Sequence, residues 1–76
     1  MSSLLYKNHF IIYGAALDKF TGKYAATGQI AWQTEAKQGK HSFTLSRLFS
    51  NASEAKVAAV EEAIAWTDQR LAPMRA

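Results

Sequence analysis

The spacing of apolar residues changes once along this chain, from a period of two to a period of about 3.6, close to residue 50. Residues 28–34 (GQIAWQT) show the first period, with Ile30 and Trp32 on one parity and glutamines on the other. In a strand, the two parities are opposite faces of a sheet. Further on, apolar residues from Val57 to Leu71 recur at helical spacing. The change predicts an α+β fold in which strands precede a helix.

The β part divides into three predicted strands joined by short polar loops. The strands span about residues 8–17, 23–34 and 41–49, and the loops between them read DKFTGK and EAKQGK. Loops this short join neighbouring strands and imply an antiparallel meander. The helix is predicted over about residues 53–72, with Glu54 in its first turn and Pro73 fixing its end. We therefore expect a single domain over residues 1–76, a three-stranded meander with its helix packed on one sheet face (β-β-β-α).

The parity of each strand predicts which side chains form the core. In the second strand, Ile30 and Trp32 face the helix, and Trp32 is expected to pack against Val60 and Ile64. The first strand is apolar on both parities, and we assign Phe10, Ile12 and Ala16 to the core. Its other parity then lies on the uncovered face of the sheet: His9, Ile11, Tyr13 and Leu17. An apolar patch in that position is typical of a protein contact.

The helix carries more apolar surface than one small sheet can cover. Its aliphatic stripe is expected to face the sheet: Val57, Val60, Ile64 and Leu71. Trp66 lies about half a turn from Val57, on a stripe of alanines. Trp66 either drapes over the sheet edge to complete the monomer core or sits in a helix surface shared between two protomers. Because a core this small invites self-association, we expect a homodimer. The candidate interface residues are Trp66, Ala59, Ala63, Ile11, Tyr13 and Leu17.

The net charge of +3 is unevenly distributed along the chain. Residues 1–53 hold six basic and two acidic side chains, whereas residues 54–76 hold three basic and four acidic ones. A basic sheet can attract a nucleic acid, and aromatic rings can stack on its bases. The candidate nucleic-acid contacts are Lys23, Lys40, Arg47, Tyr13 and His9. The alternative interpretation is that the spaced lysines keep loops soluble and sheet edges unpaired.

Catalytic, cofactor and metal-binding motifs are missing from the sequence. It has no cysteine, and its glycines lack the spacing of phosphate-binding loops. With Phe10 and Phe43 both assigned to the core, the imidazoles of His9 and His41 are expected to point to opposite sides of the sheet. We therefore expect no enzyme, no catalytic or metal-binding residue and no cofactor.

Membrane and export signals are also missing. No segment approaches the roughly 20 consecutive apolar residues that a membrane-spanning helix needs. Residues 1–6 lack the positively charged region of a signal peptide. A cytoplasmic location without membrane contact is therefore expected.

Residues 43–71, FTLSRLFSNASEAKVAAVEEAIAWTDQRL, resemble a loose group of small proteobacterial proteins of unknown function. In this group a short meander ends in an aromatic strand, and a serine-led segment opens a helix that closes on A-x-x-W-[IT]-D. The likeness rests on Ser50 or Ser53, Ala59, Ala63, Trp66, Thr67 and Asp68. The shape is also similar to HicB-type antitoxin domains and to small β-sheet modules that bind nucleic acids. The resemblance implies a meander-plus-helix fold and no assigned activity.

Together these observations predict a small non-catalytic binding module, homodimeric and acting through protein contacts. The alternative is a nucleic-acid-binding accessory or regulatory protein that uses the basic sheet region.

Overall fold

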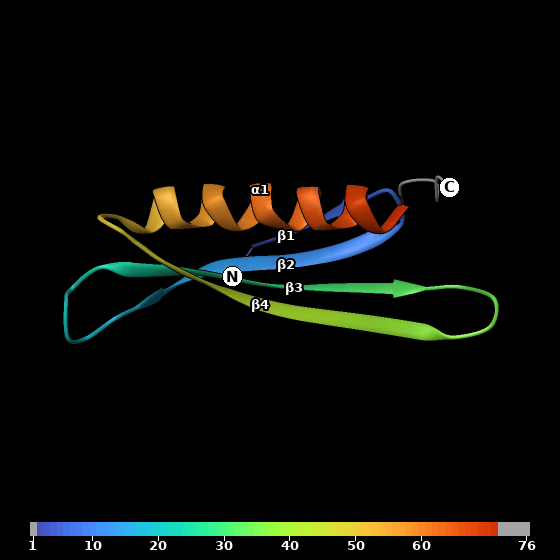
Figure 1. Ribbon diagram of the computed structural model, residues 1–76, viewed down its shortest axis with the longest axis horizontal. Coiled ribbons are helices and arrows are strands. Elements are labelled where there is room, and N and C mark those ends of the chain that lie inside the picture. Colours follow the sequence, from blue (N-terminus) through green and yellow to red (C-terminus); the bar gives the residue numbers. More distant parts are fainter. Residues whose placement is uncertain (1, 72–76) are drawn as a thin grey trace.

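A computed structural model describes residues 2–71, and within that range four strands and one helix form an α+β domain (Figure 1). The elements are β1 (Ser2–Tyr6), β2 (His9–Leu17), β3 (Tyr24–Gln33), β4 (Gln38–Phe49) and α1 (Ala52–Leu71). The strands form one antiparallel sheet in the order β1-β2-β3-β4. The α+β class, the antiparallel meander and the C-terminal helix are confirmed. The count of three strands is wrong, and the predicted stop at Pro73 lies outside the described residues.

The additional strand is β1, which joins β2 through a two-residue turn. Lys7 and Asn8 form the turn with φ values of 48° and 63°, and Tyr6 pairs with His9. Two consecutive left-handed residues suit the right-handed twist of a hairpin, and asparagine tolerates that conformation better than most residues. The first strand predicted from the sequence, about residues 8–17, corresponds to β2, and β1 lies before it.

The helix begins with a reciprocal cap. Asn51 Oδ1 accepts a hydrogen bond from the Glu54 backbone N–H at 2.8 Å, and Asn51 Nδ2 donates to Glu54 Oε1 at 2.8 Å. Two polar groups at the helix start are thereby satisfied. Glu54 also places a negative charge in the first turn, where the helix dipole favours it.

The helix rests on the sheet through small residues, which corrects the predicted stripe. Its buried side chains are Ala55, Ala59, Ala63 and Thr67. Val57, expected to face the sheet, is 58% exposed, and Leu71 is 47% exposed. Alanines let the helix backbone approach the sheet closely, and larger side chains from the strands then fill the space on either side.

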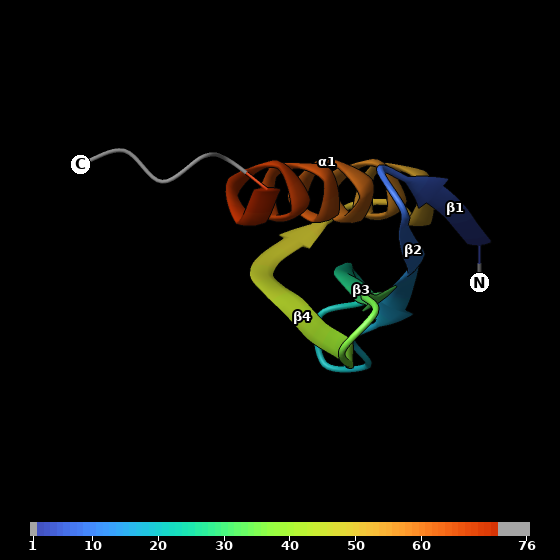
Figure 2. The same ribbon diagram turned by 90° about the vertical axis from the view of Figure 1, so that its right-hand side faces the viewer.

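The buried face of β2 is the opposite of the one predicted. His9 and Ile11 are buried under the helix, whereas Phe10 is 47% exposed on the other face. Pairing explains the parity: Ile11 lies across from Ile30 of β3, which is also fully buried. Figure 2 shows the helix covering one face of the curled sheet, with β1 at one outer edge and β4 at the other. The face turned away from the helix is called the open face below.

Candidate interaction surface

Large apolar side chains remain exposed on both faces around β1. Leu5 of β1 is 72% exposed and lies across from Phe10 on the open face. The register continues this row to Ala31 and then to Lys40 at the far edge. These four residues line a shallow hollow of about 560 Å³ together with Asn8, Trp32, Gln33, Gln38 and Gly39. This hollow therefore combines an apolar row with amide groups and one cation.

A second hollow lies on the helix side of β1. It measures about 410 Å³ and is lined by Ser2, Tyr13, Ser53, Lys56, Val57, Val60 and Glu61. Val57, Val60 and Ile64 fall within one narrow sector of the helix surface, and this set is called the aliphatic flank. The three residues were expected to bury themselves against the sheet. Instead they are half-buried or exposed beside the β1 edge.

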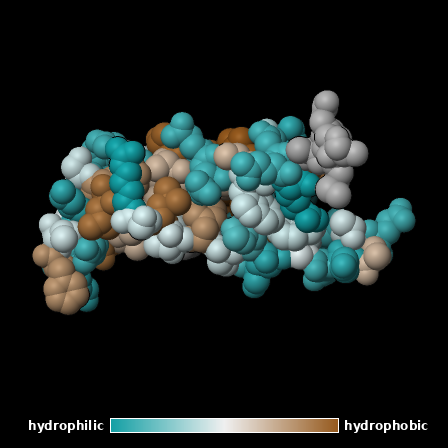
Figure 3. Space-filling view, viewed as in Figure 1, coloured by the Kyte–Doolittle hydropathy of each residue, from teal (hydrophilic) through white to brown (hydrophobic). Residues whose placement is uncertain are grey.

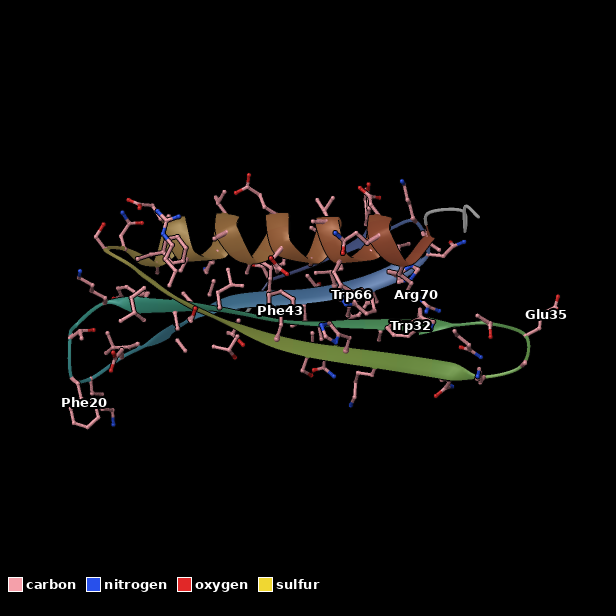
Figure 4. All side chains as sticks on the ribbon, viewed as in Figure 1. Phe20, Trp32, Glu35, Phe43, Trp66 and Arg70 are labelled. Carbon is pink, nitrogen blue, oxygen red and sulfur yellow. The ribbon has the colours of Figure 1, made fainter. Side chains whose placement is uncertain are left out.

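The opposite flank of the helix is filled by aromatic rings. The Trp66 indole stacks on the His41 imidazole at a centroid distance of 4.4 Å and an interplanar angle of 4°. The Trp32 and Trp66 rings are 5.3 Å apart, and the Arg70 guanidinium lies 4.0 Å from the centre of the Trp32 ring. Figure 4 shows Trp66 and Arg70 reaching down from the helix towards Trp32. These four residues and His9 form the aromatic cluster.

The aromatic cluster overturns two sequence-based placements. Trp32 packs against Trp66 and Arg70 rather than against Val60 and Ile64. Trp66 is half-buried inside one chain, which corresponds to the interpretation in which it completes the monomer core. Its role as an interface residue stays a prediction without a contact in the structure to support it.

Both histidines face the helix, which contradicts the expectation that they point to opposite sides. His9 is 4% exposed, and its Nδ1 lies 2.8 Å from the Lys7 carbonyl oxygen, which can only accept a hydrogen bond. Nε2 must then accept the hydrogen bond that Arg70 Nε donates at 3.3 Å. With both ring nitrogens engaged, the imidazole orients the helix end and the β1–β2 turn.

A polar contact also ties the β1–β2 turn to the helix. Lys7 Nζ and the Tyr6 hydroxyl each donate to Asp68 Oδ1 at 2.9 Å. The hydrogen bond from Lys7 holds the pKa of the Asp68 carboxyl below its ordinary value, and the same bond raises the pKa of Lys7. The contact fixes β1 beside the C-terminal half of the helix.

The predicted interface residues separate into buried and accessible ones. Ile11, Ala59 and Ala63 are fully buried in the monomer core, so their side chains are closed to a partner and their assignment is wrong. Tyr13 is half-buried and faces the helix-side hollow, whereas Leu17 is 55% exposed beyond the end of β1.

The predicted nucleic-acid contacts do not form one patch. Lys40 lies on the open face, whereas Arg47 lies over the Phe49 ring at 5.0 Å, close to the helix start. Lys23 is exposed at the start of β3, near the Arg47 end of the sheet. His9 is enclosed by the aromatic cluster and Tyr13 packs in the core, so the stacking role given to these two side chains is wrong.

Comparisons of the chain with protein-family models, curated proteins and solved structures find no match. In residues 2–71, no helix is long and apolar enough to cross a membrane. Within the same residues, no three His, Cys, Asp or Glu side chains are grouped so that they could hold a metal ion.

Sequence reasoning missed the residues that define this surface, above all Leu5 and Phe10. The signal was the pair Lys7-Asn8 between SSLLY and HFIIY, a two-residue spacing that hairpins favour. Once β1 is placed, its pairing with β2 puts Leu5 beside Phe10 and identifies the open-face row.

Proposed function

We propose that this chain is a non-catalytic binding module that works as a homodimer through protein contacts. One observation carries the proposal: the exposed side chains of Leu5 and Phe10 lie opposite each other on the open face at the β1 edge, and exposed Val57 borders the hollow on the helix side of β1. Contiguous exposed apolar surface on a small protein generally marks an interaction site. Figure 3 shows the β4 side of the molecule, where hydrophobic residues gather over the N-terminal half of the helix and hydrophilic residues cover its C-terminal half.

The alternative function is binding of a nucleic acid by the open face. The positive net charge, Lys40 and the exposed Phe10 ring favour it, because a ring beside a cation can stack a base and meet a phosphate. The separation of Lys40 from Lys23 and Arg47 weakens it, because phosphate binding strengthens as cations gather.

Light scattering on the purified chain distinguishes the two functions. The proposal expects a mass twice that of the 8.4 kDa chain at micromolar concentration, unchanged by short single- or double-stranded oligonucleotides at low salt. A monomeric mass at high micromolar concentration would reject the homodimer. A salt-sensitive increase in mass with oligonucleotide, lost when Lys23, Lys40 and Arg47 are replaced by glutamine, would favour the alternative.

A further inference from the structure

The outer edge of β1 carries free backbone groups that a second strand can use. In a two-residue hairpin, the pair flanking the turn is hydrogen-bonded, here Tyr6 with His9, and bonded pairs then alternate along the strands. Leu4 is bonded to β2 on this pattern, so the N–H and C=O groups of Ser3 and Leu5 point outwards. In the described residues 2–71, no strand pairs with this side of β1.

We infer that a second copy of this chain pairs with β1 in antiparallel fashion, with a two-fold axis at Leu4. The inference rests on the proposed homodimer and specifies how the two copies join. Ser3 of each copy then lies opposite Leu5 of the other and exchanges two backbone hydrogen bonds with it. The two four-stranded sheets become one continuous sheet.

The register is self-complementary across the whole strand. Leu4 meets its symmetry mate on the helix side, beside the aliphatic flank. On the open face, the row from Ala31 through Phe10 and Leu5 continues into Ser3 and Ile12 of the second copy. Because side chains alternate between the two faces of a strand, shifting the pairing by one residue would place the open face of one copy on the helix side of the other.

In the inferred dimer, the helix-side hollow receives polar and charged groups of the second copy. Pairing Ser2 with Tyr6 of the second copy brings that ring, with its Lys7 and Asp68 neighbours, to the hollow that Ser2 helps to line. Lys56 and Glu61 border the same hollow. The ion pair of Lys7 with Asp68 in one copy therefore meets a hollow bordered by one cation and one anion, so the two copies bring no excess of like charge together.

Single cysteines test the pairing, because the chain has none of its own. In the inferred dimer, the two copies of position 4 form a non-hydrogen-bonded pair about 4.5 Å apart at Cα, which a disulfide can span. The two copies of position 5 are about 8 Å apart, beyond that span. Under mild oxidation, L4C should form a disulfide dimer roughly tenfold faster than L5C, although Leu5 is the more exposed residue.

Since Leu4 is half-buried, a second experiment uses exposed positions only. S3C mixed with L5C should give a mixed disulfide, whereas each variant alone should not. Equal rates for L4C and L5C, together with no mixed product, would overturn the β1 pairing. Light scattering on the unoxidised wild type then distinguishes failure of the β1 pairing from failure of the homodimer itself. A dimeric mass would leave the proposed homodimer in place and reject only the β1 pairing, whereas a monomeric mass would reject both proposals.

Discussion

The two edges of the sheet differ in the features that discourage pairing with a further strand. β4 carries Lys40 and Arg47, and its pairing with β3 shifts register between Ala25 and Thr27. Charges and irregularities of this kind discourage edge-to-edge pairing. β1 reads SSLLY, with no charge, no proline and regular pairing along its five residues. The β4 edge thus carries charges and an irregularity that oppose a partner strand, and the β1 edge carries neither.

The two flanks of the helix show the same contrast. On the β4 side, Trp66 closes the space above the sheet by stacking on His41 and packing at an angle against Trp32. On the β1 side, Val57 and Val60 of the aliphatic flank line a hollow. The uncovered apolar surface of the helix therefore lies on the flank opposite Trp66. We therefore place the self-association surface at β1.

The largest effect is expected from Trp66→Ala, which removes the ring that fills the β4 side. Loss of a large core side chain costs about 3 kcal/mol of unfolding free energy, a large part of the stability of a domain this small. Trp66→Phe should recover part of it, because a ring still covers His41. Urea unfolding measures both variants. If Trp66→Ala instead lost the dimeric mass and kept its free energy of unfolding, Trp66 would be an interface residue and not a core residue.

Proline substitution compares the two edges directly. Ser3→Pro removes an outward N–H from β1. On β4, hydrogen-bonded pairs alternate from the bond between Thr34 and Lys37, so the N–H of Ser42 points away from β3. Ser42→Pro therefore removes an outward N–H from β4. Because each β1 bond recurs by symmetry, Ser3→Pro should weaken the dimer about 100-fold. Ser42→Pro should leave its dissociation constant unchanged. Sedimentation measures both, and the reverse order would identify β4 as the pairing edge.

A charge on the aliphatic flank should weaken the dimer by a smaller amount. Val57 is 58% exposed in the monomer, so Val57→Lys should leave the free energy of unfolding of the monomer nearly unchanged. In the dimer, the same substitution would bury a charge. We expect roughly tenfold weaker dimerisation. Ala65→Lys, at an exposed position on the other side of the helix, is the matched control. Equal dissociation constants for the two variants would exclude the aliphatic flank from the interface.

The smallest effect is expected from Asp68→Asn, which weakens the tie between the β1–β2 turn and the helix. Folding lowers the pKa of Asp68, so the ionised carboxylate stabilises the folded state. This contribution to the free energy of unfolding is complete above the ordinary pKa of 3.8 and is lost as the pH falls through the folded-state pKa. The pKa of Lys7 is raised above 10.5, so its contribution is lost as the pH rises through the folded-state value. Melting temperatures of wild type and variant should differ slightly at neutral pH and converge in acid. A difference that grows in acid would contradict this role.

The sequence was sufficient for the features that depend on local periodicity. The parity of β3 followed from the alternation of Ile30 and Trp32 with glutamines, and the helix followed from the change of period. The parity of β2 could not be determined in this way, because both of its faces are apolar. The parity of β2 depends on which residues the loop before Tyr24 brings opposite each other. Because Leu17 pairs with Tyr24, whose parity faces the core, the odd residues of β2 lie on the core side.

The candidate surface was harder to predict because it depends on tertiary packing. Helical spacing alone shows two apolar sectors on α1, and aliphatic size favoured the sector with Val57. Burial followed the alanines instead, since close packing of the backbone left room for Trp32, Phe43 and Trp66 on the sheet side. Propensity and hydrophobicity do not distinguish these outcomes, whereas packing does.

The most direct test of the contrast between the two edges is amide hydrogen exchange on the wild type at a concentration where it is dimeric. If β1 pairs with a second copy, the outward amides of Ser3 and Leu5 should be protected and should lose that protection on dilution. The outward amides of Lys40 and Ser42 on β4 should exchange rapidly at both concentrations. Rapid exchange at Ser3 and Leu5 in the dimeric protein, or protection at Lys40 and Ser42 instead, would contradict the account.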